Sequence, residues 1–74
     1  MAFTFEEFAT VLVTRFALDR AAITPTTTFE DLGMDSLNFE ELSVILHEEA
    51  GVLIEGETLE DLARVDAVLR ELGD

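Results

Sequence analysis

The chain has 74 residues, 49% of them hydrophobic, and 17 acidic residues outnumber four arginines, for a formal net charge of −13. This length predicts one domain over residues 1–74, which buries about 60% of the surface that the unfolded chain exposes. The charge excludes nucleic acid and anionic membranes as expected partners and favours basic protein surfaces, while acidity that serves only solubility is an open alternative.

Further exclusions follow from what the sequence lacks. Without cysteine, neither a disulfide framework nor a cysteine-based zinc site is available. No run of about 18 apolar residues occurs, so we expect no membrane span. The first residues lack the positive and long apolar regions of a signal peptide, which makes a cytoplasmic location the default expectation. We also expect a monomer.

The first expected helix covers about residues 5–17. Thr4 and Glu7 fit a capping box in front of it, and Phe3 with Phe8 fits the hydrophobic staple that accompanies such a box. Apolar residues then recur at the spacing of one helix face: Phe5, Phe8, Ala9, Leu12 and Phe16.

Residues 18–34 are predicted to form a long loop. Pro25 lies among four threonines there, and no helical or strand period is sustained. A long loop in a small domain is typical of a functional region. The sizeable apolar residues expected to anchor it to the core are Ile23, Phe29 and Leu32. Thr28 and Asp31 fit the cap of a single helical turn, and Gly33 suits a positive φ.

A second helix is expected to begin at Asp35 and Ser36, since Asp35 is a favoured N-cap residue, and to stop at Gly51. Its core face is predicted to hold Phe39, Leu42, Leu46 and Ala50, with Ser43 beside them. The opposite face holds Leu37, Glu41, Val44 and Glu48. Two apolar residues between two acids favour a docking face, although an ordinary solvated face is the open alternative.

The last third begins with a short apolar connector, residues 52–54. Residues 57–72 are expected to be helical, either as one helix or as a short turn followed by a separate helix. Thr58 and Asp61 offer an N-terminal cap. The predicted core face there consists of Leu62, Val65, Leu69 and Leu72. No segment alternates like a strand, so the expected fold is all-α: a small bundle of three main helices with one or two short helical turns and a long first loop.

Most candidates for catalysis or metal binding fail. His47 is the only histidine, and about 16 Å of helical rise separates it from Ser36, so no catalytic triad can form. The acids around residues 30–41 do not fit the ligand positions of a calcium-binding loop. We therefore expect no specific metal site, only weak divalent binding by clustered carboxylates. Phosphate-binding loops and dinucleotide fingerprints are also absent.

The segment 29–42 reads Phe-Glu-Asp-Leu-Gly-Met-Asp-Ser-Leu-Asn-Phe-Glu-Glu-Leu and closely resembles the phosphopantetheine attachment motif of acyl carrier proteins. The matching residues are Phe29, Asp31, Leu32, Gly33, Asp35, Ser36, Leu37, Glu41 and Leu42. Length, acidity, the long first loop and the mid-chain serine match as well, so the resemblance spans essentially the whole chain. It implies a 4′-phosphopantetheine arm on Ser36, with Asp35 and Leu37 in the motif around the attachment site.

The resemblance also implies a non-catalytic carrier, which holds acyl intermediates as thioesters and passes them between enzymes of polyketide or fatty-acid-type biosynthesis. A peptidyl or aminoacyl carrier of a nonribosomal peptide pathway is the alternative. The implied partners are a phosphopantetheinyl transferase and an acyl-loading enzyme, a ketosynthase or other enzymes with basic patches. These would dock on Leu37, Glu41, Val44 and Glu48. Because the chain has no thiol, the cofactor must supply it.

Overall fold

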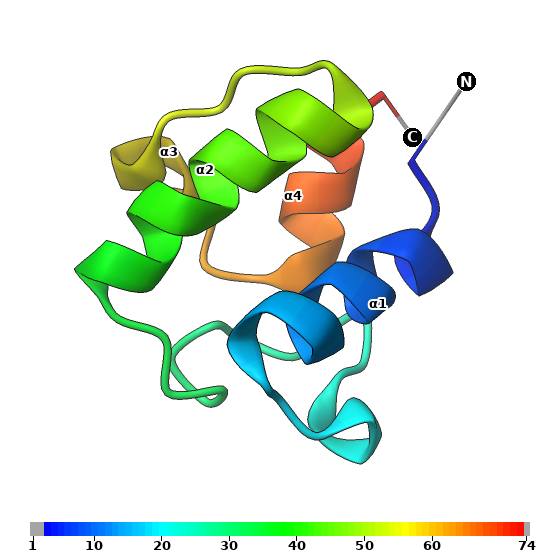
Figure 1. The fold of residues 1–74 in the computed structure, drawn as a ribbon. Coiled ribbons are helices and arrows are strands. Elements are labelled where there is room, and N and C mark those ends of the chain that lie inside the picture. Colours follow the sequence, from blue (N-terminus) through cyan, green and yellow to red (C-terminus); the bar gives the residue numbers. More distant parts are fainter. Residues whose placement is uncertain (1–2, 74) are drawn as a thin grey trace.

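The computed structural model describes residues 3–73, which form four α-helices, one short 3₁₀-helix and no β-strand. In chain order the elements are α1 (Phe5–Phe16), η1 (Arg20–Ala22), α2 (Ser36–Ala50), α3 (Gly56–Leu62) and α4 (Val65–Glu71). In Figure 1, α2 crosses the upper part of the view, α1 the lower part, and α4 lies between them. The predicted all-α class is confirmed, and the open question over residues 57–72 is resolved as two separate helices.

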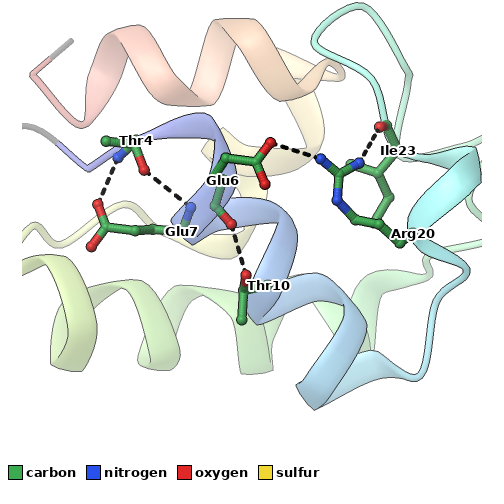
Figure 2. A network of polar contacts seen from close by, with 6 residues as sticks. All are labelled: Thr4, Glu6, Glu7, Thr10, Arg20 and Ile23. Carbon is green, nitrogen blue, oxygen red and sulfur yellow. Dashed lines mark hydrogen bonds and ion pairs between the residues drawn. The ribbon is translucent and has the colours of Figure 1, made fainter.

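Local sequence signals set the start of α1. Thr4 Oγ1 accepts a hydrogen bond from the Glu7 N–H at 3.1 Å, and Glu7 Oε1 accepts one from the Thr4 N–H at 2.9 Å (Figure 2). The ring centroids of Phe3 and Phe8 lie 6.4 Å apart, so the predicted staple is present as well. The helix ends one residue earlier than expected, because Ala17 adopts the left-handed conformation with φ of 57°.

A single hydrophobic core joins the helices to the long loop. Phe29 from the loop lies between Phe8 of α1 and Phe39 of α2, with ring centroids 6.3 and 5.6 Å away in edge-to-face contacts. Most predicted core residues are buried, but some are only half-buried: Phe5, Phe16, Ala50 and Leu62. Four buried residues within the helices were missed: Val11, Ile45, Leu59 and Val68. The core face of each helix is therefore wider than the stripe that the sequence indicated.

The long loop is pinned to the core at the expected positions. Its apolar anchors are Ile23 and Phe29, which are buried, and Leu32, which is half-buried. Thr28 Oγ1 accepts a hydrogen bond from the Asp31 N–H at 3.1 Å, as predicted for the capped turn. Gly33 has φ of 75°, which also agrees with expectation.

Backbone hydrogen bonds tie this loop to the link between α3 and α4. The bonds run from Phe29 N–H to Ala63 O at 2.9 Å, from Val65 N–H to Thr27 O at 3.2 Å and from Asp66 N–H to Pro25 O at 2.9 Å. Because the same loop leads directly into α2, these bonds fix the start of α2 relative to α3 and α4.

Arg20 fastens the other end of the loop to α1. Its guanidinium group donates to Glu6 Oε1 at 2.9 Å and to the Ile23 carbonyl at 3.0 Å (Figure 2). The same group lies 5.2 Å from the ring centroid of Phe5, in a cation–π contact. One side chain thus joins α1, η1 and the segment that follows η1.

The predicted cap at Thr58 is wrong. The helix starts at Gly56, two residues earlier, and the side chain of Glu55 before it makes no cap hydrogen bond. Gly56 sits so close to α2 that an added Cβ would lie 3.4 Å from the backbone of Phe39 and Glu40. Contact with α2, rather than a capping side chain, therefore sets where α3 begins.

Candidate functional site

The candidate site lies where the long loop enters α2. Asp35 Oδ1 accepts a hydrogen bond from the Asn38 N–H at 3.0 Å, and Asn38 Oδ1 accepts one from the Asp35 N–H at 3.0 Å. This reciprocal pair is a capping box in which Asn38 takes the place usually held by Glu or Gln. It makes Ser36 the first residue of the helix and leaves it exposed.

The turn before α2 holds this helix start in place. The Gly33 N–H donates to Glu30 O at 3.0 Å, and the Met34 N–H donates to Phe29 O at 3.1 Å. Because Phe29 is buried in the core, it fixes the turn on its core side, while Ser36 stays accessible from solvent. A large modifying protein can therefore reach the Ser36 hydroxyl.

The start of α2 favours a negative charge on Ser36. The first N–H groups of a helix have no intrahelical acceptor, and the helix dipole is positive at this end. α2 has 15 residues, so the dipole is well developed. A phosphate ester on Ser36 would meet both effects. The site thus suits attachment of an anionic group.

Two pockets flank Ser36, with volumes of about 320 and 480 Å³. The smaller lies between the long loop, the start of α2 and α3, and Met34 and Ala63 belong to its lining. The larger lies between α2 and α3. Its acidic residues are Glu40, Glu57, Glu60 and Asp61. Ser36, Phe39 and Glu60 line both pockets. Sequence reasoning missed the two α3-side residues, Glu60 and Ala63, because only tertiary packing brings them to Ser36.

The four residues of the predicted docking face all lie exposed on α2. Leu37 is 71% exposed and Val44 58%, which is unusual for large apolar side chains, and Glu41 and Glu48 are exposed beside them. Among residues 3–73 the arginines pair only with Glu6 and Asp66, outside α2 and α3. The acids on this side of the described molecule are therefore not neutralised by its own cations.

The remaining candidates add no chemistry. His47 is exposed in the last turn of α2. Within the described residues, no three histidine or acidic side chains are grouped so that they could hold a metal ion. Over the same part of the chain, every helix is too short or too polar to cross a membrane. One exposed residue that sequence reasoning did not single out is Leu53, since three consecutive apolar residues there gave no sign of which one faces outward.

Comparison with known proteins gives two results. The family model described as "Phosphopantetheine attachment site" matches residues 6–72. Two curated relatives named "Acyl carrier protein", from Helicobacter pylori strains G27 and HPAG1, are each 37% identical over 71 residues. The alignments cover 95% of this chain and 91% of each relative. The family is defined by the same group that the motif around Ser36 implied.

Proposed function

Because this chain belongs to the acyl carrier proteins and carries phosphopantetheine, we propose that the arm is attached to Ser36. The observation that supports this most is the exposed position of Ser36 as the first residue of α2, behind the Asp35–Asn38 capping box. A phosphopantetheinyl transferase would join Ser36 Oγ to the phosphorus of the arm, with cleavage of the coenzyme A pyrophosphate bond and release of adenosine 3′,5′-bisphosphate. Asp35 and Leu37 flank the acceptor in the motif that this enzyme would read.

The arm's thiol would then hold an acyl group as a thioester and present it to successive enzymes. Carrier proteins of this family are carrier subunits and not catalysts. The names of the two relatives favour a plain acyl carrier, of fatty-acid or polyketide type, over a peptidyl carrier. Loading with a malonyl or fatty unit, rather than with an amino acid, is the expected result of an acylation assay.

Partner enzymes would dock on the stripe formed by Leu37, Glu41, Val44 and Glu48. Two observations support this docking role. Both apolar residues of the stripe are exposed, and no arginine of residues 3–73 forms an ion pair with its two acids. A protein surface with basic residues around an apolar centre is complementary to such a stripe. Charge would speed the encounter, and apolar contact would hold the complex.

The deciding experiment is arm transfer followed by intact-mass analysis. Incubation with coenzyme A, Mg²⁺ and a broad-specificity transferase should add one arm. Ser36→Ala should abolish the addition. Ser43→Ala is the matched control, because Ser43 is the only other serine and lies buried on the core side of α2. An arm on Ser43, or no arm on the unaltered chain, would contradict the proposal.

A further inference from the structure

The connector between α2 and α3 exposes one leucine. Leu53 is 68% exposed, whereas its neighbours Val52 and Ile54 are half-buried and buried. Successive side chains of an extended backbone point to opposite sides, so burial of Ile54 turns Leu53 outward. Since Ile54 is fixed in the core and Gly56 lies against α2, Leu53 is held in its exposed position rather than left loose.

Simple geometry places Leu53 beside α2. Gly56 adjoins Glu40 of α2. Along the helix axis, Gly51 and Glu40 are about 17 Å apart, because each helical residue adds about 1.5 Å. The five residue steps from Gly51 to Gly56 span roughly 17 Å when fully extended. The connector must therefore run almost straight back along α2, as the yellow-green segment does in Figure 1.

This course places Leu53 within the length of α2 that the docking stripe covers. Two of the five steps carry the chain back to about the level of residues 46–47, within about 4 Å of Val44 along the helix axis. Among residues 3–73, the exposed large apolar residues are Leu37, Val44 and Leu53. All three therefore lie on or beside α2, although they come from two segments of the chain.

The surroundings of this apolar group are acidic. Glu48 on α2 and Glu55 at the end of the connector are both exposed, and the ion pairs of the described chain involve Glu6 and Asp66 instead. Leu53 is about 16 Å from Ser36 along the axis. An interface of standard size covers roughly 800 Å² on each partner, a patch about 30 Å across, so one enzyme can reach Ser36 and Leu53 together.

We propose that Leu53 is an apolar anchor of the docking surface and enters an apolar recess, rimmed by basic residues, on the phosphopantetheinyl transferase as it approaches Ser36. This rests on the proposed function and deepens it, because the contact lies outside both α2 and the attachment motif. An exposed leucine is ordinary by itself. Its level along α2, within about 4 Å of that of Val44, and its place on a connector held at both ends are what point to a binding role.

The test measures initial rates of arm transfer from coenzyme A to the whole 74-residue chain, with the carrier kept below its KM. Leu53→Ser should lower kcat/KM about tenfold, the size of loss typical of a residue central to an interface. The loss should persist at high salt, because apolar contact is not screened. Leu53→Met should restore most of the rate. Ala21→Ser, on exposed η1 away from α2, is the control and should transfer at the unaltered rate.

The outcomes separate the two proposals. If Leu53→Ser is slow but still gains one arm on Ser36 after long incubation, with an unchanged melting temperature, the docking role of Leu53 is supported. If Leu53→Ser is modified as fast as the unaltered chain, Leu53 is no anchor, while Ser36 keeps its role. If the unaltered chain gains no arm at all, the proposed function itself fails, and the role of Leu53 fails with it.

Discussion

The two helices that wall the site, α2 and α3, are built in opposite ways. α2 has a capping box between Asp35 and Asn38 at its start and Gly51, with φ of 71°, at its end. α3 has seven residues, no cap hydrogen bond from Glu55, and a left-handed alanine, Ala63, with φ of 66° after its last turn. A helix this short is not stable alone in water. Local sequence therefore specifies α2, whereas tertiary contacts hold α3.

This difference divides the site into two parts with different support. Ser36 belongs to the helix whose ends its own sequence specifies, so its place as the first helical residue follows from the local Asp35–Asn38 capping box. Glu60, which lines both pockets, belongs to the helix held from outside. The contacts that hold α3 are the fully buried Leu59, the approach of Gly56 to α2, and the Phe29 N–H bond to Ala63 O. Changes in the core should therefore loosen α3 before they disturb Ser36.

The largest expected effect tests the outside support of α3. Leu59→Ala should lower the free energy of unfolding by about 3 kcal/mol, because it removes a fully buried side chain and leaves a cavity. The exposed neighbour gives the control, since Thr58→Ala should stay within about 0.5 kcal/mol. Urea denaturation followed by circular dichroism measures both. Equal losses in the two variants would show that α3 does not depend on the core.

The second prediction compares the outer surfaces of the two helices. Glu41→Lys, in the docking stripe of α2, should slow arm transfer about fivefold at low salt, because the reversed charge repels a basic partner. Glu57→Lys, on α3, should slow it less, since no exposed large apolar residue lies on that helix. Both losses should shrink at high salt, since exposed charges are screened.

The control for net charge is Glu71→Lys, at the end of α4. Glu6 is unsuitable because it pairs with Arg20, so its reversal would also disturb the loop. If Glu71→Lys slows transfer as much as Glu41→Lys does, only net charge matters and the stripe has no special role.

The third prediction compares the two helix starts directly. Asp35→Ala should lower the free energy of unfolding by about 1 kcal/mol, because it removes the cap of α2, while Asp35→Asn should keep most of that stability. Glu55→Ala at the matching position of α3 should change it by less than about 0.5 kcal/mol, because this side chain caps nothing. Thermal or urea unfolding of the three variants provides the measurement. A similar loss at both positions would contradict the contrast.

The same contrast explains which features the sequence could predict. The start and end of α2 follow from Asp35 and Gly51, whose preferences act within a few residues, and both predictions are confirmed. The predicted cap of α3 was wrong because it rested on the capping preference of Thr58. The close packing of Gly56 on α2 determines where this helix begins. The break between α3 and α4 could not be read, since alanine is the strongest helix former, yet Ala63 ends a helix.

The reason for that break lies in a distant part of the chain. The N–H of Phe29 in the long loop donates a hydrogen bond to the Ala63 carbonyl, and the Thr27 carbonyl in the same loop accepts one from the Val65 N–H. These two backbone groups are then unavailable to a continuous helix. The same pairing helps to place one wall of the pocket beside Ser36, because Ala63, whose carbonyl accepts from Phe29, belongs to its lining. No pattern within residues 57–72 carries that information.

The smallest effect tests the strain at this break. An alanine in the left-handed conformation destabilises the folded state by roughly 1–2 kcal/mol, and glycine avoids this cost. Glycine also gives the unfolded chain more conformational entropy, which lowers the free energy of unfolding by about 0.5–1 kcal/mol. Ala63→Gly should therefore raise the free energy of unfolding by about 0.5 kcal/mol, and Ala17→Gly, with φ of 57° after α1, should act in the same direction. Ala67→Gly, inside α4, should instead lower it by about 1 kcal/mol, since that residue is helical. Urea unfolding of the three variants tests this prediction through the sign of each change in the free energy of unfolding rather than through its size. If Ala63→Gly proves destabilising while Ala17→Gly stabilises, the methyl group of Ala63 contributes contacts beside the pocket that outweigh its strain, and the end of α3 would then be held more tightly than its uncapped start.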